Sequence, residues 1–284
     1  FEEYLKHRKE TNTPYGTLKE FTTCRNRIRN FDEKRNQKTV LEDINLTWSD
    51  TFAEYLNTFG YKQGTIEKTY TILRTVLYHY YNRRNTNGVK LSYEFTLPDF
   101  KHGKKSVNKA NGLNKQQLAA LEAYVFEKQH LDRIRDRFLW QCYTGLRFGD
   151  AFTIVSGHII DNWLVITPKK TSRYDKEVKQ PLNNKALALF EKYGQDMTSL
   201  KITNQAYNKE LKEMFNEIRT KLPDLKYGVY GTHSGRDTFI TMCVQAGIDW
   251  KSILGWVGQS SYAIMDRYID LNDDYQKEQM MKLN

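Results

Sequence analysis

Residues 232–241 read THSGRDTFIT and place a histidine three positions before an arginine where a helix is expected to begin. This spacing puts His233 and Arg236 on one face of the helix. A second pair with the same spacing occurs at His130 and Arg133, and the chain holds 6 His in all. The spacing alone therefore does not separate active-site chemistry from two polar residues that share a helix face. Other motifs in the sequence are needed to separate these two interpretations.

Length and charge narrow the class of protein. A chain of 284 residues with 39% hydrophobic residues can bury a core and form one large domain or two ordinary ones. The net charge of +10 favours a polyanionic partner such as nucleic acid, although ordinary solubility charge is the alternative. Residues 1–110 carry 20 Lys and Arg against 13 Asp and Glu, and residues 111–284 carry 24 against 21. The positive excess is therefore concentrated toward the N-terminus.

Cysteine usage and hydropathy indicate the compartment. Cys24, Cys142 and Cys243 are widely spaced and form no CxxC pattern, which argues against a disulfide framework and against a zinc site. No apolar run approaches 18 residues, so we expect no membrane partner. A reducing cytoplasm fits these features best. The chain begins at Phe1 rather than Met, which leads us to expect a preceding segment.

The first hundred residues have the periodicity of helices. Residues 16–31 and 65–83 each carry an apolar stripe at helical spacing, and a third helix is predicted with Asp50 as its N-cap and Gly60 at its end. Residues 101–114 hold four Lys, two Gly and almost no apolar residue, a composition typical of a solvated linker. We therefore predict a helical domain over 1–103, a basic linker over 104–112 and a second domain over 113–284.

The second domain combines helices with a small sheet. Helices are predicted over 115–128, with Leu118, Leu121 and Val125 on its apolar stripe, and over 131–145, ending at Gly145. Residues 158–182 are rich in Ile, Val, Trp and Thr around a turn at Asp161 and Asn162, which indicates short antiparallel strands. Helices resume over 184–194 and 204–222. The predicted fold class is mainly α with a small antiparallel β-sheet.

Further motifs in this domain keep a fixed order around His233 and Arg236. TGLRFGD, residues 144–150, carries Arg147 just past a helix-ending glycine and Asp150 three residues later. TPKKTS carries Lys170 at the end of a strand. GQSS, residues 258–261, follows the opening stretch, and IMDRYIDL carries Tyr268 ten residues after Gly258.

This ordered set resembles the tyrosine recombinase (phage integrase) family, and within it the integrases of mobile elements. The resemblance covers residues 113–270 in motif order and, more loosely, the helical N-terminal domain. It implies a helical core-DNA-binding domain of the SAM-like type, followed by a mixed α/β catalytic domain.

The chemistry of a phosphodiester under attack suits these residue types. The guanidiniums of Arg147 and Arg236 can grip the nonbridging oxygens through paired hydrogen bonds and stay charged at any working pH. Tyr268 is the expected nucleophile, whose phosphotyrosine conserves the bond energy for resealing. No metal and no cofactor are expected, because the arginines hold the charge that a two-metal site would otherwise neutralise.

The resemblance assigns the remaining roles. Lys170 would protonate the leaving 5′-oxygen, and the Thr after it favours it over Lys169. His233 would be an acid, a base or an orienting group, and Asp150 would support an arginine. The family has a His after the second arginine and a His or Trp after the fourth-box glycine, whereas this chain has Asp237 and Gln259. These departures leave the strength of catalysis open.

Single residues also fit simpler interpretations. Taken alone, Arg147 fits a salt bridge to Asp150, Lys170 fits a solvated hairpin charge, and Tyr268 fits a core or surface tyrosine. Order, spacing and context together favour the catalytic interpretation. Basic side chains of the first helix and the linker are expected to contact DNA phosphates: Arg25, Arg27, Arg29, Lys104 and Lys105.

The predicted function is a site-specific recombinase or integrase that cuts and rejoins double-stranded DNA. Four protomers are expected to assemble on DNA, with possible accessory DNA-bending proteins. Two alternatives stay open at this point. One is a catalytically weakened DNA-binding accessory protein on the same fold, and the other is an enzyme similar to type IB topoisomerases that relaxes DNA without a defined site.

Overall fold

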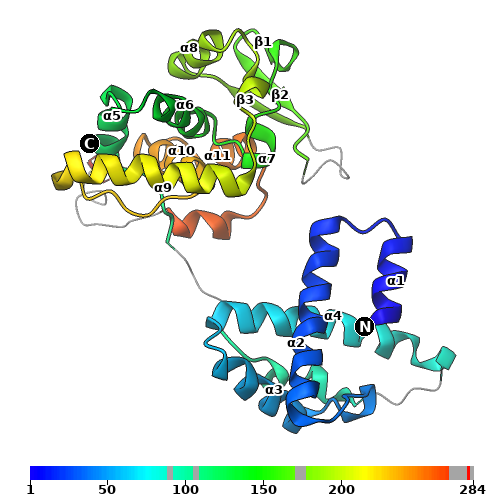
Figure 1. The fold of residues 1–284 in the computed structure, drawn as a ribbon. Coiled ribbons are helices and arrows are strands. Elements are labelled where there is room, and N and C mark those ends of the chain that lie inside the picture. The colour runs from blue at the N-terminus through cyan, green and yellow to red at the C-terminus, as the bar shows by residue number, and fades with distance from the viewer. Residues whose placement is uncertain (88–91, 105–108, 170–176, 269–279, 282–284) are drawn as a thin grey trace. The chain divides into compact units, whose positions relative to one another are not determined.

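The computed structural model describes residues 1–284 except 88–91, 105–108, 170–176, 269–279 and 282–284 (Figure 1). The chain divides into two compact units, Phe1–Val107 and Asn108–Asn284. The fold is mainly helical with one small antiparallel sheet, as the sequence predicts. None of the helices in the described ranges is long and apolar enough to cross a bilayer.

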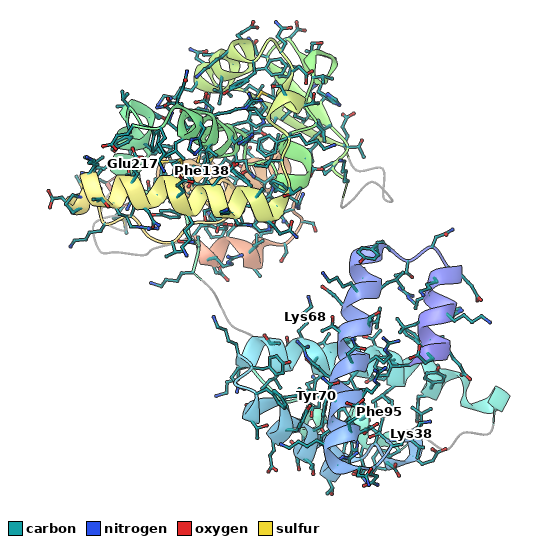
Figure 2. The ribbon with its side chains drawn as sticks, in the orientation of Figure 1. Lys38, Lys68, Tyr70, Phe95, Phe138 and Glu217 are labelled. Carbon is teal, nitrogen blue, oxygen red and sulfur yellow. The ribbon has the colours of Figure 1, made fainter. Side chains whose placement is uncertain are left out.

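The described residues of the first unit form four α-helices around an aromatic core. Phe52, Tyr70 and Phe95 are fully buried in it, and Figure 2 labels the last two. The two helices predicted over 16–31 and 65–83 are confirmed, and both run further than predicted. The helices are α1 (Glu2–Glu10), α2 (Tyr15–Arg35), α3 (Leu46–Thr58) and α4 (Gln63–Asn87), followed by the short turns η2 (Tyr93–Thr96) and η3 (Pro98–Phe100).

The predicted N-cap of α3 is wrong. The helix begins at Leu46, and the Asn45 side chain accepts a hydrogen bond from the Trp48 N–H at 2.9 Å. Asp50 lies inside the first half of the helix. The physical reason is that Trp48 and Phe52 form one buried stripe, so the helix must start before Trp48.

The second unit places helices around a three-stranded sheet of order β1-β2-β3, with both pairs antiparallel. Asp161 and Asn162 both have positive φ, 49° and 63°, which suits the predicted two-residue hairpin turn. The strands are β1 (Ile159–Ile160), β2 (Trp163–Ile166) and β3 (Val178–Pro181), and the helices are α5 (Lys115–Ala123), α6 (Gln129–Thr144), α7 (Phe148–Ala151), α8 (Asn184–Lys192), α9 (Asn204–Lys221), α10 (Ser234–Gln245), α11 (Trp250–Trp256) and η8 (Tyr262–Arg267).

Helix α5 is shorter than predicted. It stops at Ala123, and Val125 is 83% exposed rather than part of an apolar stripe. Phe126 enters the core instead, and the Arg135 guanidinium donates a hydrogen bond to the Tyr124 carbonyl. The sequence pattern predicts a helix that is too long. The reason is that Arg135, from the next helix, satisfies the Tyr124 carbonyl, which would otherwise accept a hydrogen bond from a further turn of α5.

Helix α6 is the centre of the second unit. Helices α8, α9 and α10 pack against it. Phe138 of α6, labelled in Figure 2, is fully buried, and its ring centroid lies 5.2 Å from that of Phe215 on α9. The helix ends at Gly145, which has the left-handed conformation that the sequence predicts, with φ 62°. A Cβ on Gly145 would lie 2.5 Å from Cδ1 of Phe239, so the end of α6 lies directly against α10.

Candidate active site

Arg147 lies between the end of α6 and the start of α7. It occupies the N-cap position of α7, two residues after Gly145, and is half-buried. Its Nη2 donates a hydrogen bond to the carbonyl of Gly258 at 3.3 Å. The first and fourth sequence motifs therefore meet in space.

Arg236 reaches the same turn from α10. Its Nη1 donates to the Gly145 carbonyl at 2.7 Å, and its Nη2 donates to the Val257 carbonyl at 2.6 Å. Burial, followed by the nearby charge of Arg147, lowers the pKa of Arg236 to about 10, so it stays charged at neutral pH. Two guanidiniums thus converge on the adjacent carbonyls of residues 257 and 258.

Two glycines allow this convergence. Gly258 has φ 60°, and a Cβ there would lie 2.8 Å from Cγ2 of Val178 on β3 and 3.8 Å from Nη1 of Arg147. A Cβ on Gly235 would lie 2.7 Å from Cβ of Gln141 on α6. Glycine at these positions lets α10 and the 258 turn approach their neighbours closely enough for both arginines to reach one place.

Tyr268 directly follows η8 and lies beside α10. Its hydroxyl donates a hydrogen bond to Oδ1 of Asp237 at 2.7 Å, and its ring packs in a cluster with Val257 and Met265. Burial, then the charge and hydrogen bond of Asp237, raise the pKa of Tyr268 well above its ordinary value, while Arg267 and Arg236 oppose that shift. The side chain is therefore a buried, neutral phenol.

Asp150 binds the backbone of the segment that follows β2. Its Oδ1 accepts a hydrogen bond from the backbone N–H of Lys169 at 3.1 Å, and its charge also acts on Arg236. Lys170 itself lies outside the described residues. Asp150 thus fixes the residue before the predicted proton donor.

The chain is similar to one known domain family and to several solved structures. Residues 1–87 match the phage integrase SAM-like domain. The integrase of transposon Tn1549, in complex with a circular intermediate DNA, is similar with a TM-score of 0.74 and 14% identity, covering 98% of both chains. The chain has the tyrosine recombinase fold. The fold that the motif order implies is therefore confirmed.

Two other recombinases are similar over most of this chain. The XerH site-specific recombinase, in a post-cleavage complex with a palindromic difH substrate, has a TM-score of 0.71 and 16% identity over 98% of this chain and 82% of its own. A lambda integrase tetramer bound to a Holliday junction has a TM-score of 0.68 and 15% identity over 95% of this chain and 76% of its own. No curated protein matches the sequence.

Within this tyrosine recombinase fold, His233 lies three positions before Arg236, and Gln259 directly follows Gly258. His233 is the N-cap residue of α10 and its side chain is exposed. Gln259 is half-buried, and its backbone N–H donates to the Leu254 carbonyl at 2.9 Å. Both residues adjoin segments that hold Arg147 and Arg236, and their catalytic roles stay predictions.

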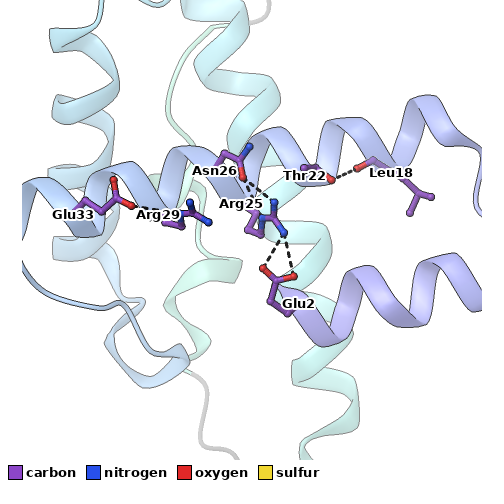
Figure 3. A network of polar contacts seen from close by, with 7 residues as sticks. All are labelled: Glu2, Leu18, Thr22, Arg25, Asn26, Arg29 and Glu33. Carbon is purple, nitrogen blue, oxygen red and sulfur yellow. Dashed lines mark hydrogen bonds and ion pairs between the residues drawn. The ribbon is translucent and has the colours of Figure 1, made fainter.

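The arginines expected to bind DNA in the first unit have partners within that unit. Figure 3 shows Arg25 donating from Nη1 to both carboxylate oxygens of Glu2, at 2.8 and 3.1 Å. In the same view Arg29 lies 3.4 Å from Glu33 one turn along α2, and its side chain is largely exposed. Because surface ion pairs are weak, phosphates can compete for these guanidiniums.

Arg27 is held more firmly than the other two. Its Nη1 donates to Oγ1 of Thr69 on α4 at 2.6 Å, and its guanidinium lies 4.8 Å from the centroid of the Tyr61 ring. These contacts favour a role in joining α2 to α4. Lys104 is exposed, and Lys105 lies outside the described residues.

The hydrogen bond between Asp237 and Tyr268 is the feature that sequence reasoning missed. The sequence singles out Asp237 as a departure from the family pattern and suggests a neighbouring cation as its partner rather than Tyr268. The two residues are separated by 31 positions, and no periodicity joins them. Only the packing of η8 on α10 brings them together.

The sequence argues against a metal site and against a disulfide framework. In the described part of the chain, no group of three or more His, Cys, Asp or Glu side chains is placed to hold a metal ion. Cys24, Cys142 and Cys243 are free, buried thiols.

Proposed function

We propose that this protein is a site-specific DNA recombinase of the integrase type, which cuts and rejoins DNA through a 3′-phosphotyrosine intermediate. One observation carries the proposal. The guanidiniums of Arg147 and Arg236 converge on the adjacent carbonyls of residues 257 and 258, and Tyr268 binds Asp237, the residue after Arg236. Two fixed positive charges and a candidate nucleophile thus share one site.

The arginines supply the charge that the reaction needs. A scissile phosphate that entered the site would offer its nonbridging oxygens to Arg147 and Arg236 in place of the backbone carbonyls. The guanidiniums would then bind a charged acceptor in place of a neutral carbonyl, and arginine can bind phosphate through two parallel hydrogen bonds, so this exchange favours the phosphate. Negative charge that builds up on these oxygens during attack would be stabilised in the same way.

The bond changes follow from these positions. The Tyr268 oxygen attacks phosphorus and loses its proton to a base in the site, while the bond from phosphorus to the 5′-oxygen breaks. Lys170 is the proposed donor of the proton that makes this oxygen a hydroxyl. A 5′-hydroxyl from another strand then attacks the phosphotyrosine and gives its proton to Lys170. A phosphodiester forms, the bond from phosphorus to the Tyr268 oxygen breaks, and the base returns its proton to that oxygen.

The proposed partner is double-stranded DNA. All three relatives compared above are DNA complexes by their descriptions, and one is a tetramer on a Holliday junction. The positive excess of residues 1–110 supports a unit that grips phosphates. We propose that four copies assemble on DNA, with accessory DNA-bending proteins as possible further partners.

One observation favours a second candidate, a DNA-binding accessory protein with weak catalysis. The Tyr268 hydroxyl is buried and bound to a carboxylate, a state that disfavours attack. Covalent trapping separates the two candidates, because an accessory protein would bind DNA without attaching to it.

The test is incubation with a nicked suicide duplex in EDTA, followed by denaturing electrophoresis. The proposed enzyme gives a detergent-resistant protein–DNA adduct, and Tyr268→Phe abolishes it while retaining DNA binding. An adduct of equal yield from Tyr268→Phe would overturn the assignment. Relaxation of a plasmid without any recombination site would point to a topoisomerase-like activity instead.

A further inference from the structure

The Asp237 carboxylate joins two segments that are far apart in sequence. Its Oδ1 accepts a hydrogen bond from the Tyr268 hydroxyl at 2.7 Å, and its Oδ2 accepts one from the backbone N–H of Asn111 at 3.1 Å. Asp237 is 8% exposed and Tyr268 is 7% exposed, so water competes little for either residue. One carboxylate therefore connects the proposed nucleophile to the start of the second unit.

Burial and the Asp237 carboxylate together favour the protonated phenol. A phenolate at Tyr268 would place a second negative charge beside Asp237, so the hydrogen bond favours the neutral form. Among the described residues, the charged groups that face Tyr268 are Asp237 and Arg236 from α10 and Arg267 from η8, whose guanidinium carbon lies 5.8 Å from the ring centroid. Burial and Asp237 outweigh the two arginines and raise the pKa of Tyr268.

Residues 110–113 pack along α10 on the same side. The Ala110 N–H donates to the Arg267 carbonyl at 3.1 Å, and the Leu113 N–H donates to Oγ1 of Thr238 at 2.8 Å. A Cβ on Gly112 would lie 2.7 Å from the backbone nitrogen of Thr238, so the segment lies directly on the helix. It therefore contacts both the residue before Tyr268 and the carboxylate that binds the Tyr268 hydroxyl.

We propose that Asp237 is a positioning residue that holds the Tyr268 hydroxyl in a protonated, buried resting state, and that release of this hydroxyl is coupled to displacement of residues 110–113. The inference rests on the proposed function, because it assigns a resting state to the proposed nucleophile. Asn111 supplies one of the two hydrogen bonds that orient the carboxylate. When that bond is lost, Asp237 can turn and Tyr268 loses its fixed partner.

Asp237→Asn is the sharpest variant. With its amide oxygen toward the Asn111 N–H, the new side chain keeps that bond and points its NH₂ group at the Tyr268 oxygen, where it favours the phenolate. Tyrosine labelled with ¹³C at Cζ reports the titration of Tyr268 by NMR, and Tyr268→Phe identifies its signal. We expect the midpoint to move to lower pH in Asp237→Asn. Asp266→Asn, which removes an exposed carboxylate two residues before Tyr268, should leave it unchanged. An unchanged midpoint in Asp237→Asn would overturn the proposal.

The second readout is single-turnover cleavage of the suicide duplex near pH 7. Asp237→Asn should cleave faster than the parent, by about tenfold for each pH unit by which the midpoint falls. Slower cleavage would show that the carboxylate is needed as a base and would overturn the resting-state role. If neither protein forms an adduct, the proposed function fails, and the NMR titration still decides whether Asp237 holds Tyr268 protonated.

Amide exchange tests the coupling without any reaction. Two bonds that share one carboxylate are linked, so loss of the Tyr268 hydroxyl should loosen Asn111. We expect the Asn111 amide to exchange severalfold faster in Tyr268→Phe than in the parent. Tyr262→Phe, which alters an exposed tyrosine of η8, is the control and should leave the rate unchanged. Equal rates in all three proteins would overturn the coupling.

Discussion

At the scale of single residues, the site depends on a few hydrogen bonds to the turn at 257–259. Arg147 and Arg236 donate to its first two carbonyls, and Gln259 follows directly. The amide of Gln259 can donate to a phosphate oxygen but carries no charge and no titrating proton. Its contribution should therefore be smaller than that of either arginine.

Gln259→Ala tests this ranking. Loss of a hydrogen bond to a charged acceptor costs about 1.5–3 kcal/mol, or about tenfold to a hundredfold in rate. We expect Gln259→Ala to slow single-turnover cleavage by that factor, Gln259→His to retain or raise the rate, and Arg236→Ala to abolish cleavage. If Gln259→Ala cleaves as fast as the parent, the residue has no chemical role.

The pH dependence of cleavage follows from two groups. Tyr268 must lose a proton that its raised pKa retains, so the rate should rise with pH through the neutral range. Arg236 has its pKa lowered to about 10, so its charge is fully present well below that pH and is lost above it. Single-turnover rates should therefore climb and then fall above about pH 10. A rate that is flat from pH 6 to 9, measured with chemistry limiting, would contradict this account.

At the scale of elements, the contact between α6 and α10 brings the arginines together. The Gly235 backbone lies so close to α6 that an added Cβ would be 2.7 Å from Gln141 Cβ. Gly255, in α11, has no atom within 4 Å of such a Cβ among the residues that the structure describes. Gly235 and Gly255 are therefore a test site and a control site for the effect of an added methyl group in a helix.

Gly235→Ala should lower the free energy of unfolding by about 1–3 kcal/mol and reduce cleavage, because the helices must separate around Arg236. Gly255→Ala should be neutral or stabilising by up to about 1 kcal/mol, since alanine favours helix. Denaturant unfolding and cleavage rates on both variants give the comparison. Equal stability of the two proteins would argue against the close approach.

Elements with local signals could be predicted from the sequence. Gly145 and the pair Asp161 and Asn162 carry their backbone conformation in their residue types, and both features are confirmed. The N-cap of α3 at Asn45 depends on packing, and the end of α5 at Ala123 depends on a side chain from another helix. The hydrogen bond from Tyr268 to Asp237 likewise needs tertiary structure, so the motif order predicts the fold but not this contact.

At the scale of the whole molecule, charge governs the predicted interaction with DNA. Phosphate contacts by lysine and arginine release counterions, so binding weakens as salt rises. We expect affinity to fall by about 10³- to 10⁵-fold between about 50 and 200 mM salt if the protein makes about 6–10 phosphate contacts. Fluorescence anisotropy with a labelled duplex measures this slope, and an affinity independent of salt would contradict the predicted phosphate contacts.

Buried titrating groups set the alkaline limit of the fold. Burial raises the pKa of Cys24 and of Tyr227 to about 12, from model-peptide values of 9.0 and 10.0, and Tyr207 shifts in the same direction. The folded chain binds these protons more tightly than the unfolded chain. The contribution of these groups to the free energy of unfolding is thus present below about pH 9 and should decline as pH rises from there toward 12. Urea unfolding at pH 8 and pH 10.5 should show the loss, and higher stability at pH 10.5 would refute it.

The central claim is that Tyr268, in a site with Arg147 and Arg236, becomes attached to DNA. The most direct measurement traps the adduct on a suicide duplex in EDTA, digests the DNA and the protein, and locates the nucleotide-bearing peptide by mass spectrometry. The account predicts one modified residue, Tyr268, among the 19 tyrosines of the chain. A nucleotide attached to any other residue, or DNA that is cut with no residue attached, would contradict it.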